Sequence, residues 1–302
     1  MTTKPMKKMT FFLLMTFLII TNCQIVPNTL SHETMQSLID EIRVQMFSPD
    51  SRNSLSVAKQ LRAMFHDCTM GCDGSINTAT ADNRGLEAYV RDIDRAYRNT
   101  PLFSNTLSKA DFVVLCGTVA LGQAIFDGVG NSGSAPSLPQ GFTVFQYGRP
   151  SNNLAADADN IEGPFPSGLG NWENVLGTTL MALKNRITEY DLVALLGVHN
   201  LGRATQTNSG FHGNWGAGAD RNRLNNGMYT FMLGRGRRRF DLVQTLASEQ
   251  NNGNPAVTPN HLQWTQLRRD GTSGTGRFLL NADLAIYHNF TTNADGSIAG
   301  GL

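Results

Sequence analysis

The sequence predicts a mainly α protein. Apolar residues recur at helical spacing in seven stretches, and no comparable stretch shows the strict alternation of a half-buried strand. Several stretches begin with a residue suited to capping a helix, such as Ser108 before Asp111 and Thr188 before Asp191. The 302 residues are 40% hydrophobic and 16% charged, which is typical of a globular protein with a large core. The expected helices span residues 35–47, 55–65, 86–97, 110–126, 175–187, 192–201 and 228–233.

The N-terminus resembles a cleavable secretory signal. Three lysines precede the apolar residues 11–20, and cleavage near Cys23 would leave residues 24–302 as the mature, secreted domain after a signal at 1–23. A membrane anchor is the alternative, but the apolar run is shorter than the ~20 residues needed to cross a bilayer. A lipoprotein signal would place a small residue before Cys23, where Asn22 stands. No second stretch of spanning length is expected downstream, so we expect no stable membrane insertion.

Charge and composition limit the partners and the domain count. With 25 basic and 24 acidic residues, the chain has no net charge that would favour nucleic acid or an anionic membrane. Residues 128–170 are rich in Gly, Pro, Ser and Asn, and form either a linker between domains or a loop laid over one helical body. We favour the loop, with residues 24–302 as a single domain and the protein as a monomer.

After signal cleavage three cysteines remain, and an oxidising compartment favours one disulfide. Cys68 with Cys72 is the natural pair. Cys116 stands in an apolar run, where a buried and unreactive thiol is expected. One glycosylation sequon, which begins at Asn289, agrees with secretion.

Arg62 and His66 are the first candidate catalytic pair. They are four residues apart, so a helix projects both side chains from one face, with Phe65 beside them. Cleavage of a peroxide needs a neutral imidazole to move a proton, and a fixed positive charge where the departing oxygen becomes anionic. A side-chain amide on the other ring nitrogen would hold the tautomer, and Asn83 is the candidate. The alternative is an ordinary Arg and His pair on a helix surface.

Residues 61–68, LRAMFHDC, resemble the distal motif of the plant, fungal and bacterial haem peroxidase superfamily. The resemblance extends from about residue 31 to residue 290. It implies a two-lobed helical fold with haem b between the lobes. It also implies that Arg62 and His66 activate hydrogen peroxide, that Phe65 lies over the haem, and that Asn83 orients His66.

Residues 191–203 end an apolar helix with His199 and resemble the proximal helix of the same superfamily. The resemblance makes His199 the axial ligand of the haem iron, whereas alone it would be read as a core histidine. Asp283 stands in an otherwise apolar segment, where an unpartnered carboxylate is costly to bury. A bond from His199 to this carboxylate would strengthen the ligand as an electron donor. A helix-capping aspartate is the alternative.

Residues 208–216 resemble the part of cytochrome c and ascorbate peroxidases that carries a proximal tryptophan, here Trp215. If its indole bonds Asp283, Trp215 could hold an oxidising equivalent as a radical, and a merely packed tryptophan is the alternative. Asn208 replaces the arginine that ascorbate peroxidases use for ascorbate, which argues against ascorbate as the substrate. Secretion removes mitochondrial cytochrome c as a partner.

A segment after the distal helix is a candidate calcium site. It offers carboxylates, hydroxyls and loop carbonyls, the oxygen ligands that Ca²⁺ prefers. It also resembles the distal calcium loop of secreted peroxidases, and one Ca²⁺ is expected. The candidate ligands are Asp67, Thr69 or Met70, Gly71, Asp73 and Ser75.

The second, proximal cation site of many relatives is expected to be empty in this protein. Asn200 replaces the usual hydroxyl residue, and Asn225 stands where an acid is common. Arg221 and Arg223 add positive charge to the same loop, which would repel a cation.

Together these patterns predict a secreted haem peroxidase. It would reduce hydrogen peroxide and oxidise an organic donor, not identified by the sequence, in one-electron steps through a ferryl intermediate. The alternative is a secreted haem-binding or matrix protein with little turnover, and a second is an apolar pocket that holds no haem. The intact set of Arg62, His66 and Asn83 favours the enzyme, and His199 with Asp283 favours haem.

Overall fold

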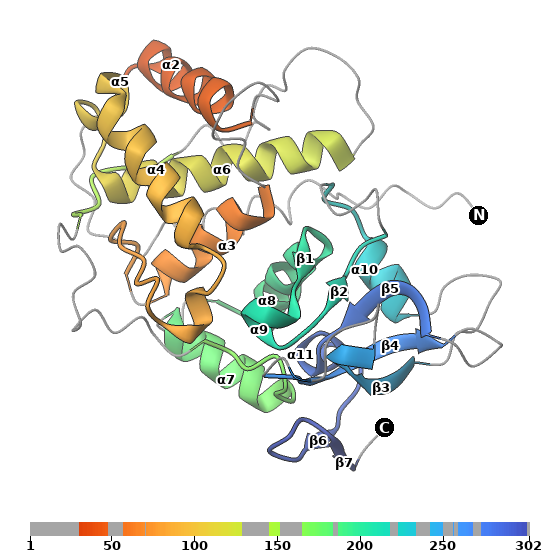
Figure 1. Ribbon diagram of the computed structural model, residues 1–302. Coiled ribbons are helices and arrows are strands. Elements are labelled where there is room, and N and C mark those ends of the chain that lie inside the picture. Colours follow the sequence, from red (N-terminus) through yellow and green to blue (C-terminus); the bar gives the residue numbers. More distant parts are fainter. Residues whose placement is uncertain are drawn as a thin grey trace, which may run out of the picture. The chain divides into compact units, whose positions relative to one another are not determined.

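A computed structural model describes residues 30–47, 57–69, 71–128, 145–151, 165–183, 187–217, 223–233, 242–249, 256, 259–267 and 273–300 (Figure 1). The expected signal, most of the loop at 128–170, Met70 and Arg221 lie outside the described residues. About 53% of the described residues are helical, which confirms the mainly α class.

The chain divides into two compact units, and each is described by itself. The first comprises residues 1–126, 132–163 and 183–195, and the second comprises residues 127–131, 164–182 and 196–302. The distal candidates Arg62, His66 and Asn83 belong to the first unit. His199, Trp215 and Asp283 belong to the second. The expected position of haem between two lobes stays a prediction.

The first unit is helical. The predicted caps are present, since the Ser108 hydroxyl accepts from the Asp111 N–H at 3.0 Å and the Thr188 hydroxyl accepts from the Asp191 N–H at 3.3 Å. Helix α2 runs into a π-helical segment, where the sequence predicted one continuous helix. The elements are α2 (His32–Ile42), the π-helical segment (Arg43–Phe47), α3 (Val57–Cys68), a 3₁₀ turn (Ala81–Asn83), α4 (Glu87–Asn99), α5 (Pro101–Ser104), α6 (Lys109–Gly128) and α8 (Glu189–Leu196).

Helix α6 is the central helix of this unit. Among the described residues, its segment Lys109–Phe126 is long and apolar enough to cross a membrane, so the expectation of no further stretch of spanning length was wrong. However, 78% of that segment is buried, which is typical of the core helix of a soluble protein. Phe112 and Leu115 pack with Phe103, Tyr89 and residues of α2. Cys116 is buried as expected, and burial raises the pKa of its thiol well above the ordinary value.

The second unit combines short helices with a five-stranded sheet of order β1-β2-β5-β4-β3. Its pairs are antiparallel except for the parallel pair of β2 and β5. The helices are α7 (Trp172–Ala182), the 3₁₀ turn η4 (Gly197–Asn200), α9 (Gln206–Ser209), α10 (Gly227–Met232), a 3₁₀ turn (Ala247–Glu249) and α11 (Asn281–Leu284). The strands are β1 (Arg203–Ala204), β2 (Gly213–Asn214), β3 (Leu242–Leu246), β4 (Leu262–Leu267), β5 (Ser273–Leu279), and the separate hairpin of β6 (Thr291–Thr292) and β7 (Ile298–Gly300).

The sequence did not indicate this sheet. In β4 the buried residues Gln263, Trp264, Thr265 and Gln266 are consecutive, so burial does not follow the period of two that marks a half-exposed strand. Gln263 is bonded to the backbone of His212, and the Thr265 hydroxyl lies 3.2 Å from that of Thr245. Strand β5 then leads directly into α11, which carries Asp283.

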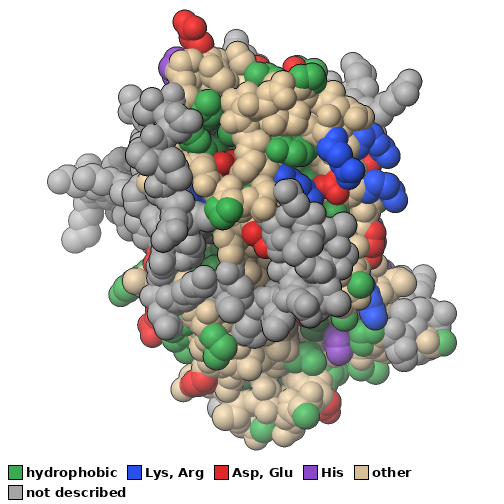
Figure 2. Space-filling view, turned by 90° about the vertical axis from the view of Figure 1, so that its left-hand side faces the viewer, with side chains coloured by type: hydrophobic (Ala, Val, Ile, Leu, Met, Phe, Trp, Pro, Cys, Tyr) green, Lys and Arg blue, Asp and Glu red, His purple; other side chains and the backbone are tan. Residues whose placement is uncertain are grey.

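The surface carries mixed charge. In the view of Figure 2, basic side chains gather with acidic ones beside them. On α4, Arg95 pairs with Asp92 at 3.2 Å and Arg98 pairs with Asp94 at 3.4 Å. Exposed pairs of this kind contribute little to stability.

Candidate active site

Helix α3 places three of the distal candidates. Arg62, Phe65 and His66 lie in its last two turns, and the His66 side chain is buried with the core-facing side of the helix. The Phe65 and His66 rings meet edge to face, with centroids 5.9 Å apart. The helix ends at Cys68, and the Thr69 hydroxyl donates to the His66 carbonyl at 2.8 Å. These contacts fix the backbone that carries His66.

Asn83 holds His66 as the sequence predicted. His66 Nδ1 and Asn83 Oδ1 lie 2.5 Å apart, and both side chains are buried. The Asn83 amide nitrogen donates to the Asn77 carbonyl at 2.8 Å, so the amide oxygen is the atom that faces His66. An amide oxygen only accepts, and therefore Nδ1 carries the proton. Nε2 is left as the basic nitrogen of His66.

Arg62 also bonds the segment that carries Asn83, through the residues on either side of it. Its guanidinium donates to the Asp82 carbonyl at 2.5 Å and to the Arg84 carbonyl at 3.0 Å, and these two residues flank Asn83. The sequence did not predict these contacts, because they use backbone carbonyls that leave no signature in side chains. Arg62 therefore fixes the loop that holds Asn83, in addition to supplying positive charge.

The electrostatics keep His66 neutral. Burial, and next the positive charge of Arg62, lower the pKa of His66 from 6.5 to about 4, and the bond to Asn83 opposes this only partly. Burial also lowers the pKa of Arg62, which remains a cation at neutral pH. At pH 7 the distal group is thus an uncharged base beside a fixed positive charge.

His199, Asp283 and Trp215 form the second group. Helix α8 passes into η4, which carries His199, and Asp283 lies in α11. His199 Nδ1 and Asp283 Oδ1 lie 2.7 Å apart, and the Trp215 indole N–H donates to Asp283 Oδ2 at 2.6 Å. The His199 and Trp215 rings stack with centroids 4.8 Å apart and an interplanar angle of 28°. The structure thus brings together all three residues that the sequence assigned to the proximal side.

Asp283 is fully buried and is satisfied by donors. In addition to His199 and Trp215, the Leu280 backbone N–H donates to its Oδ2 at 2.8 Å. These bonds offset the cost of burying a carboxylate. Asp283 also caps α11, which was the alternative role predicted from the sequence. The His199 side chain is 35% exposed, and because Nδ1 is bonded to Asp283, Nε2 is the nitrogen left to bind a ligand.

Arg277 supports this group and was not predicted. Its guanidinium donates to the Trp215 carbonyl at 3.1 Å and to the Gly227 carbonyl at 2.9 Å, and it lies 4.1 Å from the centre of the Phe231 ring. The next residue, Phe278, packs its ring against Trp215 at 4.3 Å. No sequence motif marks Arg277, because the contacts named here are to two carbonyls and a ring face.

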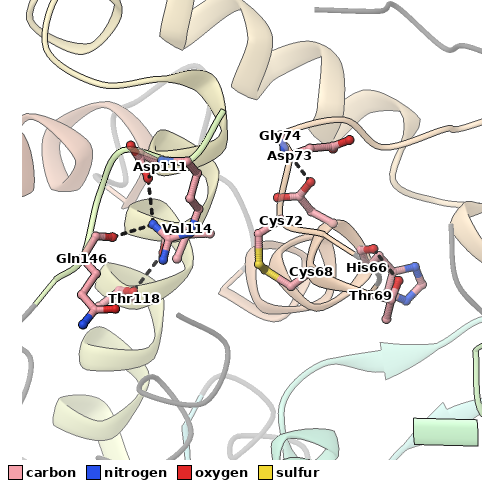
Figure 3. The surroundings of a disulfide bond; sticks show 12 residues. His66, Cys68, Thr69, Cys72, Asp73, Gly74, Asp111, Val114, Thr118 and Gln146 are labelled. Atoms are coloured by element: carbon pink, nitrogen blue, oxygen red, sulfur yellow. Dashed lines mark hydrogen bonds and ion pairs between the residues drawn. A yellow bond between two sulfur atoms is a disulfide. The ribbon is translucent and has the colours of Figure 1, made fainter. Parts of the chain in front are cut away.

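The candidate calcium loop follows α3 directly (Figure 3). A disulfide joins Cys68 and Cys72, as predicted. Asp67 Oδ1 accepts from the Gly74 N–H at 2.7 Å, and Asp73 Oδ1 accepts from the backbone N–H and the hydroxyl of Ser75. Gly74 has φ 79°, and a Cβ there would lie 2.6 Å from the Ala110 nitrogen, so the position requires glycine.

The loop has the features of a cation site, although no group of three or more His, Cys, Asp or Glu side chains suited to a metal occurs among the described residues. The other Asp67 oxygen, Oδ2, is buried without a hydrogen-bond partner. Burial, and next the like charge of Asp73, raise the pKa of Asp67 well above its ordinary range. A cation would satisfy this oxygen and relieve the repulsion. Thr69, whose hydroxyl is bonded to His66, could contribute only its carbonyl or the second lone pair of that hydroxyl.

The fold and these two groups define a helical protein with a neutral base beside an arginine, and a histidine bonded to a buried carboxylate. The family model described as Peroxidase matches residues 39–294. The chain therefore belongs to the peroxidase family. No curated protein matches the sequence.

Proposed function

We propose that this protein is a secreted haem peroxidase that reduces hydrogen peroxide and takes the electrons one at a time from an organic donor. The peroxidase activity follows from the family, and the finer statements rest on the two groups described above. The observation that carries the proposal is His66, which is buried, neutral, and held by Asn83 with its basic nitrogen available.

Haem fits the second group. His199 Nε2 would bind the iron, while the Asp283 carboxylate on Nδ1 gives the imidazole partial imidazolate character and strengthens it as an electron donor. When bound, the haem supplies the iron centre at which the peroxide oxygen–oxygen bond is cleaved. Trp215 shares the same carboxylate, which supports the hypothesis that it holds an oxidising equivalent.

The distal residues handle the proton and the charge. His66 Nε2 accepts a proton from the oxygen of hydrogen peroxide that will stay, and then gives it to the oxygen that leaves as water. Arg62 stabilises the negative charge that develops on the leaving oxygen. Because Nδ1 is held by Asn83, the imidazole keeps the same orientation through both transfers.

Calcium and secretion are parts of the same proposal. Asp67, Asp73 and Ser75, with carbonyls at Thr69 and Gly71, would hold one Ca²⁺ next to the end of α3 and so fix the position of His66. The disulfide supports an oxidising compartment, and the sequon residue Asn289 is exposed, as glycosylation requires. The donor is not specified by the described residues.

Haem titration followed by stopped-flow mixing with hydrogen peroxide tests the proposal. We expect a high-spin ferric spectrum, and rapid loss of that spectrum on mixing with one equivalent of peroxide. His66→Ala should slow this reaction by about 10²-fold or more, as is usual for loss of a general base. His32→Ala, at an exposed position of α2, is the matched control and should react normally. If haem binds but peroxide does not react with it, the haem-binding alternative replaces the enzyme.

A further inference from the structure

Asn200 directly follows His199, and its side chain is fully buried. We propose that Asn200 is a positioning residue, whose amide fastens the turn that carries the iron ligand to the start of α10 and takes the place of a bound cation. This inference rests on the proposed function for the role of His199. The fastening itself rests only on the contacts below.

Both the oxygen and the nitrogen of the Asn200 side-chain amide form hydrogen bonds. Its oxygen accepts from the Met228 backbone N–H at 2.9 Å, in the first turn of α10. Its nitrogen donates to the Arg223 carbonyl at 3.0 Å and to Asn225 Oδ1 at 3.1 Å. The same Asn225 oxygen accepts from the Gly227 N–H at 2.7 Å. One neutral amide thus links η4, the loop before α10, and α10 itself.

The group is closely packed on the side of Trp215 as well. A Cβ on Gly216, the residue after Trp215, would lie 2.7 Å from the Asn200 carbonyl. A Cβ on Gly227 would lie 2.8 Å from Asn225 Oδ1 and 3.0 Å from Asn200 Oδ1. The backbone contact requires glycine at position 216, and a side chain at position 227 would displace the two amides. Asn200 therefore contacts the residue that follows Trp215, and it is itself the residue that follows His199.

This arrangement does not fit the cation that many relatives are expected to bind here. Hard cations require oxygen ligands, whereas the Asn200 nitrogen presents N–H donors. Those donors already bond the Arg223 carbonyl and the Asn225 side-chain oxygen, which are the oxygens that a cation at this turn would need as ligands. Asn225 is also neutral where a carboxylate would attract the ion. Hydrogen bonds therefore hold this turn in place of ion–oxygen bonds.

Asn200→Asp is the decisive variant, because it replaces the N–H donors with an oxygen of the same shape. That oxygen would face the Arg223 carbonyl and Asn225 Oδ1 at about 3 Å, where like partial charges repel. Three oxygens at this spacing match neighbouring ligands around Ca²⁺, whose bonds are about 2.3–2.6 Å. The variant should therefore need a cation at this turn, which hydrogen bonds alone hold in the natural protein.

The measurement is the melting temperature of the full mature chain without haem, in EDTA and in Ca²⁺. All variants carry Asp73→Asn, which removes the response of the distal loop. In EDTA, Asn200→Asp should melt roughly 4 °C or more below its parent, and Ca²⁺ should restore most of that loss. The parent should show no Ca²⁺ response. Asn208→Asp, at an exposed position of α9, is the matched control and should resemble the parent.

The haem-loaded protein supplies the readout of positioning. The iron–histidine stretching band of the reduced protein, measured by resonance Raman, should not change with EDTA in the parent. In Asn200→Asp it should shift in EDTA and return with Ca²⁺. A purely structural role would lower stability without this reversible change at His199.

Several outcomes would overturn the proposal. One is an Asn200→Asp protein as stable as its parent in EDTA, and another is a parent whose melting or iron–histidine band responds to Ca²⁺. If Asn200→Asp does not fold, Asn225→Ala provides the test: it should melt lower than the parent with no Ca²⁺ response, and equal stability would refute the role of the amide. Failure to bind haem would instead count against the proposed function, because the melting data need no haem.

Discussion

Asn83→Asp tests the control of His66 by its neighbours. The substitution keeps the shape of the amide but places a carboxylate against His66 Nδ1, where the amide oxygen lies at 2.5 Å. Two unit charges about 4 Å apart interact by about 4 kcal/mol at an effective dielectric constant of 20. This energy favours the imidazolium form and corresponds to a roughly thousand-fold gain in proton affinity.

The expected result is a displaced pH profile. With a pKa of about 4, His66 is about nine-tenths neutral at pH 5 in the natural protein. A thousand-fold gain in proton affinity would leave roughly one molecule in a hundred with a neutral base at pH 5. The reaction with peroxide should therefore be about 10²-fold slower at pH 5, and should recover towards the natural rate near pH 8.

The assay is the second-order rate of peroxide reaction from pH 4 to 9, by stopped flow on the haem-loaded protein. Asn105→Asp adds the same charge at an exposed position and should leave the profile unchanged. Melting curves are needed in parallel, because the new carboxylate also loses the bond to the Asn77 carbonyl. A folded Asn83→Asp protein with the natural pH profile would refute the view that the low pKa of His66 depends on an uncharged partner at Nδ1.

Three further predictions concern the other groups. Asp283→Asn should raise the reduction potential of the haem iron, because His199 loses its anionic partner, and spectroelectrochemical titration with no change would contradict the proximal assignment. Trp215→Phe should lower stability by about 1–3 kcal/mol through the lost indole bond and should slow donor oxidation; unaltered turnover on every donor would remove the radical hypothesis. Removal of Ca²⁺ should destabilise the protein more at pH 8 than at pH 4, because the raised pKa of Asp67 costs stability as pH rises from the ordinary carboxyl pKa to the raised one, and calorimetry that shows equal losses would argue against Asp67 as a ligand.

The sequence was most informative where structure is local. Helices such as α3, α4 and α6 follow from apolar spacing, and α6 also from its Ser108 cap, because these interactions link residues three or four apart. The strands of the second unit were missed, since β4 buries polar and apolar residues in succession and its partners are distant in the chain. Helix α6 was predicted at residues 110–126, but it was not counted among stretches long and apolar enough to cross a membrane.

The candidate site was predictable in its side chains and not in its backbone contacts. The bond between His66 and Asn83 joins residues 17 apart, and it was predicted from the need for an amide on the second ring nitrogen and from the resemblance. Arg62 and Arg277 donate to backbone carbonyls, which every residue has, so the sequence could not indicate these partners. Asn200 was noted as a departure from related sequences, but its role needed the positions of Met228 and Arg223.

The disulfide between Cys68 and Cys72 bears on how the protein is best produced. The bond closes a loop of only five residues, for which the chain-entropy model gives about 2 kcal/mol, less than the stability of about 5–15 kcal/mol that is usual for a domain. Expression in a reducing cytoplasm should therefore yield folded protein with two reduced thiols beside the end of α3, while the buried Cys116 stays inert. Such material would have a looser helix end two residues after His66, and its low activity could be mistaken for a lack of catalytic capacity. Oxidation of the thiols before assay, or export to an oxidising compartment, avoids that error.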